Sequence, residues 1–375
     1  MRQSLAGGRG LATRFSYLSA RPQVPVQAGS LADPARAIIG PGRDALFFWG
    51  APLVAFLLVQ LWLRGWDLLA PPTTAGPMVI AMFGFIAVLT WAHLIAVVPR
   101  AYFNADVFAA HRFRLTVVPI ALIALLLLSP TALAVAAVLA VFWDVHHSAM
   151  QNFGFARIYD MKAGNAPQLL RATDLRLNWA LYVGPLAAGA ALATHVDYFG
   201  RFDGTTLQAL TSVPGVLAAE HRGIRLAAIG LYAVVIAWTA LDYARAMRAG
   251  YRLPAHKLAT LLVTGTVSIL AWGFSPPLVA LAAINLYHAV QYFALVWAKE
   301  GGSMAATFDR AGAGENGGGR TRAALFFFAG SAIFGLGYAA AVAGSIAWFV
   351  APFIACSLLH FWYDSFIWSV RKRQL

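Results

Sequence analysis

Long, uninterrupted runs of apolar residues recur along the chain from residue 45 to the C-terminus, and short polar segments separate them. A helix needs about 20 predominantly apolar residues to cross the hydrocarbon core of a bilayer. Membrane-spanning strands would instead alternate between polar and apolar residues over about ten positions. Because the runs are continuously apolar, they predict an all-α fold, a polytopic integral membrane helical bundle.

The runs predict about ten transmembrane helices. Two pairs of neighbouring runs are separated only by Ser129-Pro130 and by Ser275-Pro276-Pro277. Proline has no backbone N–H with which to continue a helix, so we expect tight hairpins at both junctions. The predicted spans lie near 45–63, 77–98, 115–128, 131–153, 178–195, 224–243, 258–274, 277–297, 323–343 and 346–369.

Composition supports a membrane location. The chain is 60% apolar and 11% charged, whereas soluble proteins average about 45–50% and about 25%. The net charge of +13 would suggest nucleic acid in a soluble domain, but Lys and Arg also mark the cytoplasmic loops of membrane proteins. We therefore expect the lipid bilayer as partner, and no nucleic acid. The single cysteine, Cys356, excludes a disulfide within one chain and a thiolate metal cage.

The distribution of Lys and Arg predicts the orientation. With the N-terminus inside and the spans alternating, 24 of the 28 Lys and Arg fall in cytoplasmic segments. Merging one hairpin would invert every later loop and destroy this asymmetry. We therefore expect an even number of spans with both termini cytoplasmic. The four exceptions are Arg64, Arg201, Arg222 and Arg225.

The polar segments define the remaining organisation. Residues 1–43 are Arg-rich and lack an apolar core of signal-peptide length, so we expect a basic, disordered N-terminal tail. Residues 44–370 form one transmembrane helical domain, in which the Gly-rich segment 301–319 predicts a flexible cytoplasmic loop. Residues 371–375 form a basic cytoplasmic tail. The composition is compatible with a bacterial inner (plasma) membrane.

Histidines mark four of the predicted spans at a similar depth. All four spans run from outside to inside, and each carries its histidine late, in the cytoplasmic half. Ionisable groups are costly in a bilayer and usually face the bundle interior or a water-filled cavity. We therefore expect one shared site near the cytoplasmic face. The predicted metal ligands are His93, His147, His288, His360, His146 and His111, the last of which lies in the basic segment on the same side.

Carboxylate and amide side chains accompany three of these histidines within about one helical turn. Such groups orient the ligating imidazoles of metal sites, and they also form hydrogen bonds between membrane helices without any metal. His146 points about 100° away from His147, so it either ligates separately or bonds a neighbouring helix. The predicted supporting residues are Asp144, Gln151, Asn285, Gln291 and Asp364.

The types of ligand limit which metal ions the site could bind. Imidazole with an occasional carboxylate suits iron, copper or zinc. Redox iron fits best if the substrate is apolar and reacts with oxygen, so the pattern predicts non-haem iron, one or two ions, with copper, zinc and haem as alternatives. Trp143, Tyr292 and Trp362 are candidates for lining a substrate channel, although aromatic residues at this depth also form the interfacial belt of membrane proteins.

Isolated histidines on several transmembrane helices, without a compact histidine box, resemble the bacterial membrane β-carotene cleavage dioxygenases. The resemblance covers the His-bearing spans and implies one non-haem iron held by four histidines from the helices. Membrane desaturases and hydroxylases are more distantly similar. Only the pair His146-His147 matches them, because their H-x-x-H-H boxes are absent here.

The sequence thus predicts a membrane-embedded, metal-dependent oxygenase or desaturase that acts on a lipophilic substrate such as a lipid or isoprenoid, with an electron-donor protein as a further partner. An ion- or proton-coupled transporter would use the same polar groups as a path. A haem-binding electron carrier would use two of the histidines as axial ligands. A purely structural scaffold leaves the membrane-embedded Asp144 and Asp364 unexplained.

Overall fold

The computed structural model describes residues 30–65, 76–197, 204, 208, 221–311, 318–344 and 347–368. Within these ranges the regular structure is helical, and nine helical stretches are long and apolar enough to cross a membrane. Large apolar side chains such as Ile80, Ile120 and Leu128 face outward. Exposed apolar surface on this scale is unusual for a soluble monomer and suits contact with lipid. The prediction of an all-α, integral membrane helical bundle is confirmed at this level.

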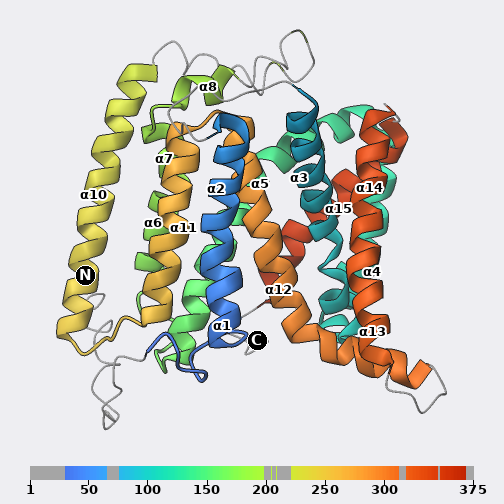
Figure 1. Ribbon diagram of the computed structural model, residues 1–375, viewed down its shortest axis with the longest axis horizontal. Helices are drawn as coiled ribbons and strands as arrows, with labels where there is room; N and C mark the ends of the chain where they lie inside the picture. Colours follow the sequence, from blue (N-terminus) through green and yellow to red (C-terminus); the bar gives the residue numbers. More distant parts are fainter. Residues whose placement is uncertain are drawn as a thin grey trace, which may run out of the picture.

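The helices run alternately up and down the bundle (Figure 1). Several spans consist of consecutive helical segments joined end to end without a loop. The elements on the N-terminal side of the chain are α1 (Pro41–Asp44), η3 (Ala45–Gly50), α2 (Ala51–Arg64), α3 (Pro77–Ile95), η4 (Pro99–Phe103), α4 (Ala105–Leu128) and α5 (Pro130–Lys162). Those on the C-terminal side are α10 (His221–Arg248), α11 (Ala255–Phe274), α12 (Pro277–Ala311), α13 (Gly319–Ala324), η6 (Leu325–Ala329), α14 (Gly330–Ala343) and α15 (Ala347–Ile367).

Both predicted hairpins are confirmed. Helix α4 ends before Ser129, whose extended backbone turns the chain and whose side chain accepts the N–H of Ala132 at 3.2 Å. Helix α5 then begins at Pro130, and α12 begins in the same way at Pro277. Proline suits the first helical position because its missing N–H would have no partner there.

The predicted span 178–195 is not one continuous helix, and this part of the prediction is wrong. The chain forms α6 (Arg171–Tyr182), α7 (Gly184–Ala188) and α8 (Leu192–Asp197), which rise along α10 and α11 (Figure 1). Gly189 ends α7 in an extended conformation, and a Cβ there would lie 2.3 Å from the Cα of Gly273. Close contact between α7 and α11 therefore requires a glycine at the point where the helix breaks.

The predicted flexible loop 301–319 is largely helical instead. Helix α12 continues to Ala311, and α13 begins at Gly319. Met304 is fully buried against Ala323 and Phe327. Burial of this apolar face offsets the low helix propensity of the glycines in the segment. Residues 312–317 lie outside the described part of the chain.

The predicted N-terminal tail is ordered where the structure describes it. Ala37 and Ile38 are buried, and the backbone N–H groups of Ile38 and Ile39 donate to the carboxylate of Asp44 at 2.7 and 2.9 Å. These bonds hold residues 38 and 39 against Asp44, the last residue of α1. Residues 1–29 and the predicted basic tail 371–375 lie outside the described residues.

A buried ion network joins α5, α6 and α11 at the end of the bundle where α1 and α13 lie (Figure 1). The ammonium of Lys257, fully buried, lies 2.7 Å from Asp160 and 2.8 Å from Asp174. Arg157 forms ion pairs with the same two carboxylates. Burial, reinforced by Asp160, raises the pKa of Tyr251, so its hydroxyl remains a donor to Asp160. The two positive charges of this network thus balance its two negative charges, and the ion pairs fix the end of α5 against α6 and α11.

Candidate metal centre

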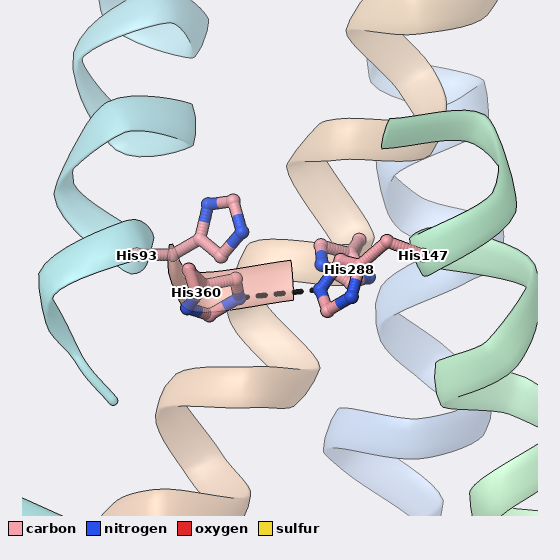
Figure 2. A group of neighbouring side chains, drawn as sticks. All are labelled: His93, His147, His288 and His360. Carbon is pink, nitrogen blue, oxygen red and sulfur yellow. Dashed lines mark hydrogen bonds between the residues drawn. The ribbon is translucent and has the colours of Figure 1, made fainter. Parts of the chain in front are cut away.

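Four histidines from four helices meet inside the bundle. His93 comes from α3, His147 from α5, His288 from α12 and His360 from α15. Each offers one ring nitrogen, and these four atoms all lie within 4.8 Å of one another. All four side chains are buried. Figure 2 shows the rings projecting into one space between their helices.

The four rings form a closed, nearly perpendicular arrangement. His93 and His147 each lie between His288 and His360, with ring centroids 4.9–5.0 Å apart and interplanar angles between 72° and 88°. The Nε2 atoms of His147 and His360 are 3.2 Å apart, as the dashed line in Figure 2 marks. Two nitrogens bound at about 2.1 Å to one metal would be about 3.0–3.4 Å apart for angles between 90° and tetrahedral. This pair already has the spacing of two ligands of one ion.

Hydrogen bonding leaves several ring nitrogens available. Nδ1 of His360 lies 3.1 Å from the carbonyl of Leu94 and donates to it, so its Nε2 presents a lone pair to the group. Neither ring nitrogen of His288, nor of His93, makes a hydrogen bond of normal geometry to any residue that the structure describes. A buried polar group without a partner costs about 1–3 kcal/mol. A metal ion at the centre would supply the missing partner.

Asp364 lies beside this group, one turn after His360 on α15. Its Oδ2 is 3.7 Å from Nε2 of both His147 and His360. Its Oδ1 accepts hydrogen bonds from the hydroxyl of Tyr292 at 2.8 Å and from Nε1 of Trp368 at 3.1 Å. The carboxylate is therefore held with one oxygen directed at the ligand nitrogens.

The other predicted supporting residues bond to one another rather than to the imidazoles. Asn285 donates to Asp144 at 3.1 Å one turn before the histidines, and Gln151 donates to Gln291 at 2.9 Å one turn after them. Their side chains are long enough to reach the facing helix. They therefore tie α5 to α12 on both sides of the group, and they orient His147 and His288 through the helices.

Two of the six predicted ligands lie outside the group. The ring of His146 packs against Trp179 of α6 at 5.2 Å, because neighbouring residues on a helix point in different directions. His111 lies at a kink in α4, where its backbone is non-helical, and its ring packs against Phe366 at 4.6 Å. The structure therefore brings together four of the predicted ligands.

A cavity of about 640 Å³ reaches the group from one side. His147 and Asp364 line it, and so do two of the three predicted substrate-lining residues, Trp143 and Tyr292. The third, Trp362, packs instead against Phe366. The sequence analysis did not single out three further cavity residues on one face of α5, Met150, Gly154 and Arg157, nor Arg171 at the start of α6.

Fold and site together define an integral membrane helical protein with a buried four-histidine group whose geometry suits a metal ion. Neither a protein-family model, nor a curated protein, nor a solved structure matches this chain.

Proposed function

We propose that this protein is a membrane-embedded oxygenase in which His93, His147, His288 and His360 hold one non-haem iron ion. One observation carries the proposal: four buried imidazoles direct donor atoms to one point, and two of them have no other partner of normal geometry among the described residues. Imidazole ligands suit iron, copper and zinc. When bound, iron would supply the binding and redox chemistry of molecular oxygen.

The cavity supports a lipophilic substrate. Trp143, Phe153 and Phe361 form apolar walls that lead to His147 and Asp364. A hydrocarbon chain in such a cavity offers few groups for hydrolysis, which favours oxidation. An oxygenase that transfers both oxygen atoms to a C=C bond of its substrate needs no external electrons. Insertion of one oxygen atom, or desaturation, would need two electrons from a donor protein.

The chain's own residues have separate roles in this proposal. The four histidines bind the ion, and Asp364 faces the ligand pair His147 and His360 from the cavity side. Tyr292 and Trp368 orient the carboxylate of Asp364. The aromatic walls exclude water from the approach to the site.

We also propose ten membrane crossings, with α6 to α8 as a broken fifth crossing, and cytoplasmic termini in a bacterial inner membrane. The Lys and Arg distribution supports this orientation, and it puts the histidine group nearer the cytoplasmic face. A C-terminal fusion should fluoresce when it carries green fluorescent protein and stay inactive when it carries alkaline phosphatase. The opposite pattern would invert the topology.

Metal analysis of the purified protein tests the central claim. After anaerobic loading with Fe(II) and removal of free metal, we expect about one iron ion per chain by mass spectrometry. His288→Leu and His147→Leu should lose the iron. His256→Leu is the matched control, because His256 is equally buried in α11 but lies outside the group. An iron-free wild type, or a His288→Leu variant with unchanged iron, would refute the proposal.

The two alternative functions can each be tested, and the haem carrier fits this geometry less well. A haem offers only two axial positions, and its macrocycle would occupy the plane where the other two imidazoles lie. A Soret band in the purified protein would reverse that judgement. An ion- or proton-coupled transporter would show flux in liposomes that His288→Leu abolishes in the absence of iron.

A further inference from the structure

The cavity that reaches the histidine group is long and has two different ends. Its wall on α5 extends from Trp143 to Ile158, which corresponds to about 22 Å along the helix axis. His147 lies toward the first end. Arg157 and Arg171 line the other end, beside the loop that connects α5 and α6. A ligand that fills the cavity must therefore match a deep apolar part and a cationic part.

The two arginines at the cationic end are not equivalent. Arg157 forms ion pairs with Asp160 and Asp174 and also donates to the carbonyl of Pro167 at 2.8 Å, so its charge is compensated. Arg171 makes no ion pair with an acidic residue in the described part of the chain. Its guanidinium lies 5.6 Å from the ring centroid of Phe153, which places it over the cavity wall.

Charge is therefore distributed unevenly along the cavity. Among the described residues that line the cavity, Asp364 is the one carboxylate; it lies at the deep end and accepts hydrogen bonds from Tyr292 and Trp368. Between His147 and Phe153 the wall on α5 includes Met150 and Gln151. A guanidinium pairs strongly with carboxylate or phosphate, often through two hydrogen bonds. The uncompensated cation of Arg171 thus matches an anionic group at the membrane surface.

We propose that the cavity binds a single-chain amphiphile whose anionic head group, a carboxylate or a phosphate, pairs with Arg171. The chain lies along α5 and reaches His147 and Asp364. Phe153 is six residues from His147, so the head group and the metal centre are separated by about 9 Å along the helix. The proposal names the substrate class of the proposed oxygenase, but the binding step itself does not require the metal.

Direct binding to the full-length protein in neutral phosphatidylcholine nanodiscs tests the head group. The probes are palmitate, hexadecyl phosphate and hexadecanol, which share a chain and differ in charge. We expect at least one anionic probe to bind about tenfold more tightly than the alcohol, or about 1.4 kcal/mol. Arg171→Gln should remove that difference and leave hexadecanol binding unchanged, while Arg171→Lys should retain part of it. The better anionic probe identifies carboxylate or phosphate.

A second variant tests the cavity itself. Gly154 lines the cavity, and a Cβ built on it meets no atom within 4 Å, so Gly154→Leu fills the space without displacing backbone. We expect it to weaken all three probes. Gly230→Leu is the matched control, because Gly230 also has open space around it but lies on the exposed face of α10. Equal binding in both variants would place the ligand elsewhere.

The outcomes separate this inference from the oxygenase proposal. His288→Leu should lose iron and keep the preference for anionic probes. A wild type that binds no iron but prefers anionic probes through Arg171 would refute the oxygenase proposal and still support the amphiphile-binding site. A wild type that binds iron but binds palmitate, hexadecyl phosphate and hexadecanol alike, or keeps its preference after Arg171→Gln, would overturn the inference alone.

Discussion

Replacing His288 by leucine should change stability in opposite directions with and without metal. Both ring nitrogens of His288 are buried without a hydrogen-bond partner among the described residues. Without metal, an unsatisfied polar group of this kind costs about 1–3 kcal/mol, and an apolar side chain of similar size removes that cost. The metal-free variant should therefore be at least as stable as the metal-free wild type.

Bound metal should reverse this order of stability and make the wild type more stable than His288→Leu. A ligand that binds only the folded state stabilises it by about 2.7 kcal/mol when its free concentration is 100 times the dissociation constant. The wild type gains this energy, and His288→Leu, which lacks one of four ligands, gains much less. Thermal unfolding in detergent, followed by circular dichroism with either a chelator or anaerobic Fe(II), measures both differences. The metal-loaded wild type should unfold at the highest temperature of the four samples.

The control and the refuting result follow from the same design. His256 is also buried, but it packs against Trp49 and Tyr159 away from the group, so His256→Leu should keep the full metal shift. If Fe(II) shifts His288→Leu as much as the wild type, the histidine group does not bind the ion. If His288→Leu is strongly destabilised in chelator, the unpartnered imidazole is not a cost that metal relieves.

Three further predictions concern neighbouring features. Asp364→Asn should keep the four histidines but weaken metal affinity by about 10–100-fold, measured by competition with a chromogenic chelator; unchanged affinity would separate Asp364 from the metal. Gly335→Ala should destabilise the protein by about 1–3 kcal/mol, because a Cβ there would lie 2.2 Å from the carbonyl oxygen of Val88. Gly330→Ala on the same helix is the control, and its free energy of unfolding should lie within about 0.5 kcal/mol of wild type. Equal thermal unfolding of the two variants would contradict the close packing of α14 on α3. Lys257→Met should cost about 3–5 kcal/mol, because it leaves two buried carboxylates with one cation; a wild-type unfolding temperature would show that the network is not stabilising.

Local sequence signals predicted much of the fold. The Ser-Pro junction at Ser129 marked a hairpin because Pro130 lacks the backbone N–H that would continue the preceding helix and suits the first position of the next one. The break near Gly189 was missed because it depends on contact with Gly273 on a helix far away in the chain. Helix α12 continues past Gly301 because Met304 packs against α13, which no local propensity reveals.

The candidate site was predictable in part for similar reasons. Depth along each helix follows from the sequence, so the shared level of His147 and His288 could be anticipated. The direction of each side chain about its helix axis determines which of the predicted ligands meet, and it places His146 against Trp179 instead. Periodicity placed Asp144 on the same face as His147, but only the facing helix determined that Asn285 is its partner. The iron, the substrate and the cytoplasmic position of the site stay predictions.

The ligands of the histidine group are spread over almost the whole chain, from His93 on α3 to His360 on α15. Because a chain is synthesised from its N-terminus, the first two ligands are inserted long before the last, and the fourth arrives only with α15. Asp364 is on the same helix and arrives with it. Metal occupancy at this centre would therefore report that α15 has been inserted, and a chain truncated or stalled before α15 would carry the early histidines without a complete site.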